Sequence, residues 1–275
     1  MVNRINVIVV TGASSGIGNA SATFLAKKGN KVYGTCRNPG SYSRKADEFF
    51  ELLQMDLTDS SSVTRVAETI FAAEGKVDAL ICCAGSGFVG AIEDSSLEES
   101  QSVMNINYFG TLRTIKAFLP RMREAGKGRI LIIGALEGIA ATPYQGFYSS
   151  SEHALEGLAE TLRLEVLDFG LEVGLIELGS FRTSFGQKRS FAVGASESSP
   201  YKARIDAVLG ILSRDEAGSM EPLIAARAIH AALSARRLPL RKTVGALPRR
   251  VLTESKRWLP ARIFEEIIRK YYKVN

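Results

Sequence analysis

The sequence predicts an α/β fold: one doubly wound parallel sheet of about seven strands with helices on both faces. Short apolar runs bounded by turn residues alternate with stretches of helical periodicity, which is the pattern of successive βαβ units. The chain has 275 residues, of which 45% are hydrophobic and 23% charged, as is usual for a soluble domain that buries its own core. We therefore expect residues 1–275 to form a single domain without internal repeats.

The strand and helix predictions follow from these alternating patterns. The predicted strands are 5–10, 31–36, 52–56, 77–84, 129–135, 171–177 and 241–246. The predicted helices lie at about 16–28, 60–74, 97–125, 148–169 and 221–235. The segment 180–219 lacks clear periodicity and is rich in Ser, Gly and charge. Long connections of this kind are usually binding loops, so we expect a substrate loop or lid, the alternative being a mobile insertion without a role.

The positive charge of the chain lies at its C-terminal end. The net charge is +6, yet residues 236–275 alone hold 12 Lys or Arg against three Glu. The segment 236–275 is therefore a basic extension, and the rest of the chain is slightly acidic. This distribution argues against a nucleic-acid footprint spread over the fold.

Within that extension, residues 258–272 form an amphipathic pattern. Its apolar members are Ile263, Phe264, Ile267, Ile268 and Tyr271, which recur at helical spacing. We expect such a helix to pack against the body of the protein, and contact with an anionic membrane surface is the less favoured alternative.

Cysteine usage indicates a reducing compartment, and the lengths of the apolar runs bear on secretion and membrane insertion. The three Cys residues cannot make a disulfide framework, and no Cys/His spacing resembles a zinc site, so no metal is expected. The apolar run near the N-terminus is too short for a signal peptide, and no stretch approaches the roughly 18 apolar residues of a membrane span. We therefore expect a cytoplasmic protein.

A glycine-rich segment follows the first predicted strand and opens the first predicted helix. Its residues of interest are Gly12, Ser14, Ser15, Gly16, Ile17 and Gly18. Glycine allows a tight turn and close approach of the backbone to a pyrophosphate, while the helix N-terminus favours negative charge. The segment therefore predicts a dinucleotide site.

Residues 11–18 match the pattern TGxxxGxG and resemble the glycine motif of the short-chain dehydrogenase/reductase family. Further residues that carry the resemblance are Asp56, Leu57, Ala84, Gly85, Asn107, Tyr148, Gly179 and Thr183. The match covers about residues 5–185, and its pattern is most similar to the hydroxysteroid and retinol dehydrogenase branch. The resemblance implies a Rossmann-type fold, a small-molecule carbonyl or alcohol substrate, and a homodimer or homotetramer formed through the helices near 108–125 and 148–169.

The resemblance assigns roles to these residues. Asp56 and Leu57 lie in the segment that contacts adenine, and Ala84 and Gly85 end the Asn-Ala-Gly motif. Asn107 and Tyr148 match the catalytic Asn and Tyr.

The choice between NAD(H) and NADP(H) depends on the residue after the second strand. An acid there hydrogen-bonds a ribose 2′-hydroxyl, whereas an Arg accommodates a 2′-phosphate. This chain has Arg37 and no acid at that point, with Ser14 nearby in the glycine segment. The predicted cofactor is therefore NADP(H).

Two catalytic positions depart from the family pattern. Ala135 stands where the family has its catalytic Ser, and Glu152 stands where it has the Lys four residues after Tyr148. Ala135 offers no side-chain donor to a substrate oxygen, a loss worth roughly 3 kcal/mol of transition-state stabilisation. Glu152 replaces the cation that would lower the pKa of Tyr148, so Tyr148 is expected to be a poor base that can still donate a proton.

Three functions are compatible with this pattern. The favoured one is an NADP(H)-binding carbonyl or alcohol oxidoreductase with an atypical active site, in which Glu152 accepts hydrogen bonds from the cofactor ribose. The alternatives are a catalytically silent dinucleotide sensor or scaffold, and a non-redox enzyme that uses Tyr148 and Glu152 for acid/base chemistry.

One acid and three phenylalanines are further candidates for the lining of the substrate pocket. Glu137 could reach the pocket, although a solvated loop acid is the favoured interpretation. Phe181, Phe185 and Phe191 suggest an apolar pocket for a lipid, steroid or aromatic ketone, or else they are core contacts.

Overall fold

The computed structural model describes residues 7–43 and 48–274 and contains the predicted parallel sheet. Its seven strands follow the order β3-β2-β1-β4-β6-β7-β9, and every neighbouring pair is parallel. The strands are β1 (Val7–Thr11), β2 (Lys31–Cys36), β3 (Glu51–Gln54), β4 (Ala79–Cys82), β6 (Gly128–Ala135), β7 (Leu171–Leu178) and β9 (Arg241–Val244). Two short strands, β5 (Phe88–Val89) and β8 (Ser190–Phe191), pair with each other outside this sheet.

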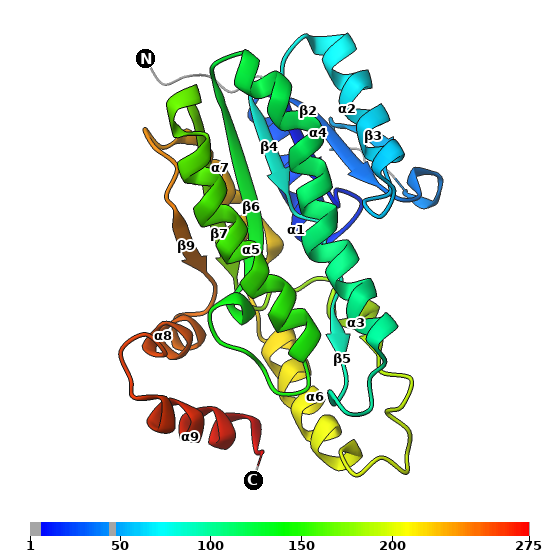
Figure 1. Ribbon diagram of the computed structural model, residues 1–275, viewed down its shortest axis with the longest axis vertical. Coiled ribbons are helices and arrows are strands. Elements are labelled where there is room, and N and C mark those ends of the chain that lie inside the picture. Colours follow the sequence, from blue (N-terminus) through cyan, green and yellow to red (C-terminus); the bar gives the residue numbers. More distant parts are fainter. Residues whose placement is uncertain (1–6, 44–47, 275) are drawn as a thin grey trace.

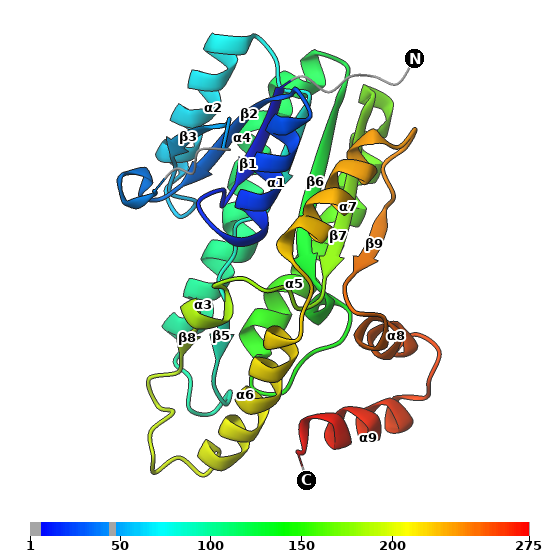
Figure 2. The same ribbon diagram turned by 180° about the vertical axis from the view of Figure 1, so that it is seen from behind.

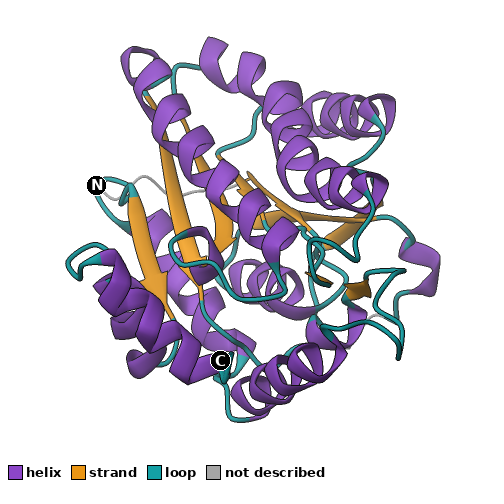
Figure 3. Ribbon diagram, turned by 60° about the horizontal axis from the view of Figure 1, so that its bottom comes forward, coloured by secondary structure: helices purple, strands orange, loops and turns teal. Residues whose placement is uncertain are grey.

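Helices cover both faces of the sheet. On one face lie α2 (Ser60–Glu74), α4 (Gly110–Glu124) and α5 (Gly146–Glu165), and on the other α1 (Gly16–Lys27) and α7 (Pro222–Ser234) (Figures 1 and 2). Beyond the carboxyl ends of the strands lie α3 (Leu97–Met104), α6 (Lys202–Ala217), α8 (Leu247–Ser255) and α9 (Ala261–Tyr272). Figure 3 shows the strands enclosed between these layers of helices. The protein is therefore an α/β doubly wound fold of the Rossmann type.

The core consists of two apolar layers, one on each face of the sheet. Ile70, Phe118 and Leu155 represent the layer beneath α2, α4 and α5. Leu25 and Ile229 represent the layer beneath α1 and α7. Strands β1 and β4 are buried along their whole length, which explains why they appear in the sequence as continuous apolar runs rather than alternating ones.

The described residues confirm the predicted order of strands and helices, with boundaries shifted by a few residues. Residues 5 and 6 of the first predicted strand lie outside the described residues. The long helix predicted over 97–125 is interrupted by a π-helical turn, Asn105–Phe109. Within the described residues, no helix combines the length and the apolar character needed to cross a membrane.

Two regions are more ordered than the sequence predicts. The aperiodic segment 180–219 contains β8 and the helix α6, whose buried residues Val208 and Leu212 pack against Tyr272 of α9. In the basic extension, the edge strand β9 and the helix α9 were predicted, and the helix α8 is additional. Charged residues interrupt the apolar pattern of α6, which is why its helical period is weak in the sequence.

Candidate active site

A cavity of about 420 Å³ lies at the carboxyl edge of the sheet, between β1 and β4. The chain leaves β1 for β2 and β3 on one side and returns to β4 on the other. Open α/β sheets bind ligands at such a reversal. All residues predicted for the site line this cavity, namely Gly12, Ser14, Ser15, Gly16, Ile17, Gly18, Arg37, Asp56, Leu57, Ala84, Gly85, Asn107, Ala135, Tyr148, Glu152, Gly179 and Thr183.

The glycine segment forms a tight turn that leads into α1. Gly12 and Gly16 have φ angles of +72° and +57°, a region that side chains rarely adopt. A Cβ on Gly12 would lie 2.9 Å from Cα of Ala84, so a side chain there would displace the neighbouring loop. The first turn of α1 has no side-chain cap and no acid. Its N–H groups and helix dipole therefore suit a phosphate group.

One end of the cavity carries Arg37 and Asp56, which follow β2 and β3. Thr58 donates hydrogen bonds to Asp56 Oδ1 from its backbone N at 2.9 Å and its hydroxyl at 2.7 Å. These two bonds hold the pKa of Asp56 below its ordinary value, and the charge of Arg37 acts in the same direction. The Arg37 carbonyl accepts a bond from Gln54 Nε2, which fixes the loop. This end thus presents a cation beside an ionised carboxylate.

Away from Arg37 and Asp56, Asn107 connects the loop after β4 with the helix α5. It sits in the π-helical turn, a distortion often found at functional sites. Its Oδ1 accepts from the Ser86 backbone N at 2.8 Å, while its Nδ2 donates to the Ser86 carbonyl at 3.0 Å and to Ser151 Oγ at 2.9 Å. Ser151 in turn donates to the carbonyl of Tyr148. Asn107 therefore fixes the loop after β4 relative to α5.

Glu152 lies one turn after Tyr148 on α5 and points toward the end of β6. Its carboxylate accepts a hydrogen bond from the backbone N of Ala135 at 2.9 Å. Burial raises the pKa of Glu152 to about 8, the charge of Glu137 adds to the rise, and the Ala135 bond opposes it. Much of Glu152 is therefore protonated at neutral pH.

A second buried acid, Glu177 of β7, lies behind Glu152 and does not line the cavity. Burial raises the pKa of Glu177 to about 8, with a further contribution from the charge of Glu152. Arg241 Nε lies 4.0 Å from its carboxylate. Glu177 was not predicted as a site residue, because an acid within an apolar strand carries no motif.

Tyr148 is buried against the segment after β7, with its ring centroid 5.8 Å from that of Phe185. Burial raises the pKa of Tyr148 well above its ordinary value of 10.0, and the charges of Glu152 and Glu137 raise it further, whereas Arg189 acts in the opposite direction. The sequence predicted that Glu152 would disfavour the ionised form of Tyr148, and the raised pKa agrees with that direction. The largest cause, however, is burial, which the sequence could not show. Tyr148 therefore keeps its proton and can act as a donor.

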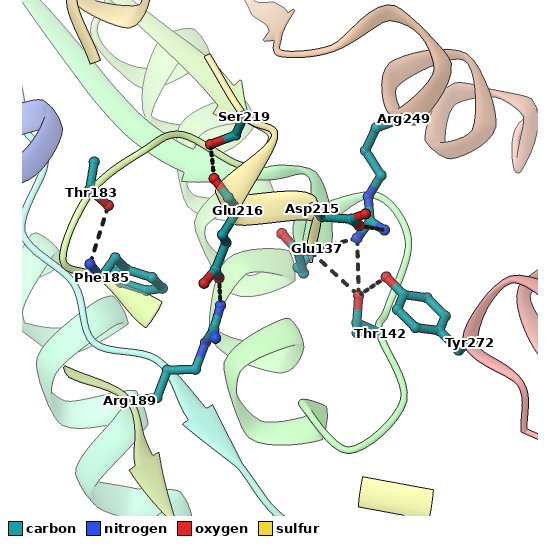
Figure 4. A network of polar contacts seen from close by, with 10 residues as sticks. All are labelled: Glu137, Thr142, Thr183, Phe185, Arg189, Asp215, Glu216, Ser219, Arg249 and Tyr272. Carbon is teal, nitrogen blue, oxygen red and sulfur yellow. Dashed lines mark hydrogen bonds and ion pairs between the residues drawn. The ribbon is translucent and has the colours of Figure 1, made fainter. Parts of the chain in front are cut away.

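The segment after β7 closes over the cavity. Thr183 packs against the glycine turn, since a Cβ on Gly16 would lie 3.4 Å from its side chain. Lys188 Nζ lies 3.4 Å from Ser15 Oγ, and Arg189 forms an ion pair with Glu216 of α6 (Figure 4). The Nε of Arg189 is buried without a hydrogen-bond partner among the described residues. Thr183 was predicted for the site, whereas Lys188 and Arg189 were not, because the segment has no periodicity and no motif marks them.

The C-terminal helices contact α6 and the turn after β6. Arg249 of α8 lies 3.0 Å from the Glu137 carboxylate and 3.7 Å from that of Asp215 (Figure 4). Tyr272 of α9 shares a hydrogen bond of 3.1 Å with Thr142. The expectation that α9 packs against the body thus holds for Tyr272 and for Ile268, which packs beside it, whereas Ile263 and Tyr271 are exposed. The favoured interpretation of Glu137 as a solvated acid was wrong, because its carboxylate is largely buried in this network.

The three phenylalanines differ in location. Phe185 and Phe181 line the cavity, and Phe181 also belongs to the core beneath α1 and α7. Phe191 is 52% exposed and lies outside the cavity lining. The suggestion that all three form an apolar pocket is therefore wrong for Phe191, because β8 turns its side chain toward solvent.

Comparison with known proteins gives consistent matches. A family model described as short chain dehydrogenase matches residues 6–192. The chain is 36% identical over 269 residues to a 3-ketodihydrosphingosine reductase of Bacteroides thetaiotaomicron, covering 98% of both chains. It is 38% identical over 194 residues to human 17-beta-hydroxysteroid dehydrogenase type 1, covering 66% of this chain and 58% of that protein. A solved short-chain dehydrogenase from Streptomyces avermitilis superposes with a TM-score of 0.74 at 31% identity, covering 92% of this chain and 97% of that one.

Proposed function

The chain belongs to the short-chain dehydrogenase family, and from this premise we propose that it is an NADP(H)-dependent reductase of carbonyl compounds. The observation that carries the proposal is the common cavity, in which a phosphate-binding glycine turn, Arg37, Asn107 and Tyr148 lie together. Members of this family transfer hydride between a nicotinamide cofactor and a small molecule.

The residues of the cavity fit a dinucleotide. The glycine turn leaves no room for a Cβ at Gly12, and the uncapped N-terminus of α1 provides free N–H groups for the pyrophosphate. Arg37 would hold a 2′-phosphate, Asp56 would accept a bond from adenine, and Lys188 would add a cation beside the phosphates. When bound, NADP(H) supplies hydride transfer to or from the carbonyl carbon.

The direction of the reaction follows from the state of Tyr148. A phenol whose pKa is raised by burial and by nearby carboxylates is a weak base at neutral pH. It still donates a proton to an oxygen that gains negative charge, which is the requirement of carbonyl reduction. Ala135 provides no side-chain donor, so the buried N–H of Arg189 is a candidate for the second bond to that oxygen.

We further propose an extended, apolar ketone as the substrate. The relative that matches over nearly the whole chain is named for the reduction of 3-ketodihydrosphingosine. Around Tyr148, the cavity is lined by Leu178, Phe181, Phe185 and Leu212, which can bury an apolar chain.

A second candidate is a protein that binds the dinucleotide without turnover. It is favoured by one observation: no lysine or arginine within the described residues forms an ion pair with Glu152, so position 152 itself offers no cation in place of the family lysine. The two candidates share the cofactor site and differ only in catalysis.

The first test is a parallel titration of the purified protein with NADPH and NADH, which requires no knowledge of the substrate. We expect NADPH to bind at least tenfold more tightly, and we expect NADPH oxidation in the presence of long-chain ketones. Absence of binding by both cofactors would refute both candidates. Binding without turnover on a ketone panel, followed by a gain of turnover in the double variant Ala135→Ser/Glu152→Lys, would favour the silent protein.

A further inference from the structure

The cavity has two ends, and only one of them is free for the nicotinamide half of a dinucleotide. The pyrophosphate belongs at the N-terminus of α1, and the end marked by Arg37 and Asp56 suits the adenosine half. The other nucleoside must then extend across the switch point toward the ends of β6 and β7. Tyr148, Glu152 and Gly179 line that end. This placement rests on the proposed function.

The cations around this end already have carboxylate partners. Arg249 of α8 pairs with Glu137, which lies in the turn after β6. Arg189 of the segment after β7 pairs with Glu216 of α6. Neither guanidinium is therefore available to compensate a charge at the neighbouring position 152.

Glu152 itself has only a backbone partner, the N–H of Ala135 at 2.9 Å, and it forms no ion pair within the described residues. On the side of the sheet, Glu177 of β7 adds another carboxyl group, and Arg241 lies 4.0 Å from that group rather than from Glu152. On its own helix the neighbour is Tyr148, a neutral phenol. A buried carboxylate with such neighbours favours a cationic ligand.

The two redox forms of a nicotinamide cofactor differ in the charge of one ring. The oxidised ring is a cation and the reduced ring is neutral. We propose that Glu152 makes this site select the oxidised cofactor over the reduced cofactor, so that the protein discriminates the redox state of the NADP(H) pool. In a reductase, the same carboxylate favours the direction that leaves the ring positively charged.

This discrimination has a pH signature. Burial holds the pKa of Glu152 at about 8 in the free protein, whereas the bound cation requires the ionised form. The affinity for NADP⁺ should therefore rise about tenfold per pH unit up to pH 8 and then become constant. The affinity for NADPH should lack this rise, because its ring carries no charge.

The experiment measures the dissociation constants of NADP⁺ and NADPH between pH 6 and pH 9.5, by calorimetry and by NADPH fluorescence. For the native protein we expect the ratio of the NADP⁺ constant to the NADPH constant to fall at least tenfold over this range. Calorimetry in buffers of different ionisation enthalpy should detect proton release when NADP⁺ binds below pH 8. This signature requires no variant.

Two variants locate the effect. Glu152→Gln should make the ratio independent of pH. Glu177→Gln is the matched control, because it removes a carboxyl group of similar pKa that does not line the cavity. The ratio should still fall with pH in Glu177→Gln, although the midpoint can move because the two carboxyl groups interact. The inference is overturned if both cofactors bind and the ratio is constant in the native protein, or if the pH dependence persists in Glu152→Gln. If neither cofactor binds, the proposed function fails as well.

Discussion

The ion pair between Arg249 and Glu137 joins the C-terminal helices to the turn beside the active site, and replacing Arg249 by Met tests its energetic role. The two groups lie 3.0 Å apart, and their side chains are only 16% and 14% exposed. Breaking a fully buried pair costs about 3 to 5 kcal/mol. Because this pair is slightly exposed and Met retains part of the packing, we expect Arg249→Met to lower the free energy of unfolding by about 3 kcal/mol.

The loss arises mainly from leaving Glu137 charged and unpaired. Arg249→Met should therefore cost much less, about 1 kcal/mol, when Glu137 is already Gln, which gives a coupling of about 2 kcal/mol. That remainder includes the contact of the guanidinium with the Tyr272 ring, whose centroid lies 5.5 Å away.

Urea unfolding of the four proteins of this double-mutant cycle measures these energies by linear extrapolation. A loss below 1 kcal/mol in Arg249→Met, or single-variant losses that simply add, would refute the reasoning. The cofactor titration provides a second readout. Because the charge of Glu137 raises the pKa of Glu152, Glu137→Gln should shift the midpoint of the NADP⁺ pH dependence to lower pH.

The remaining predictions concern the cavity and the buried acids. A Cβ on Gly18 would collide with the Gly12 carbonyl, so Gly18→Ala should weaken NADPH binding more than tenfold in a fluorescence titration; unchanged affinity would contradict the placement of the pyrophosphate. Arg37→Glu should reverse the preference in favour of NADH, and a retained NADPH preference would show that another cation holds the 2′-phosphate. Arg189→Met should lower kcat/KM for a ketone about tenfold while NADPH affinity stays within twofold; a parallel loss of affinity would assign Arg189 to cofactor binding. The pKa of Glu152 is raised from 4.5 to about 8 in the folded protein, which then holds a proton that the unfolded chain has released. The free energy of unfolding should thus fall as pH rises from 4.5 to 8, by at most about 1.4 kcal/mol per pH unit for this group. Glu152→Gln should remove this contribution from the slope of the urea-unfolding profile and leave that of Glu177, whose pKa is also raised to about 8.

Much of the fold was predictable because the sheet is parallel and covered on both faces. The apolar runs of β1 and β4 and the glycine turn before α1 are local signals, and each refers to residues close in sequence. The helix α6 was not predictable in this way. Its buried positions pack against segments far away in the sequence: Leu212 against Tyr272, 60 residues later, and Ile205 against Val89 and Ala91, more than 100 residues earlier.

The same distinction applies to the candidate site. Sequence by itself determined the α/β class, the glycine turn with Arg37, and the residue types at positions 135 and 152, because these depend on local spacing and order along the chain. Only the tertiary structure decided that Lys188 and Arg189 close the cavity, that Glu137 is held by Arg249, and that burial keeps Glu152 and Tyr148 protonated. Burial and charge pairing depend on segments that are distant in sequence, and a one-dimensional pattern contains neither.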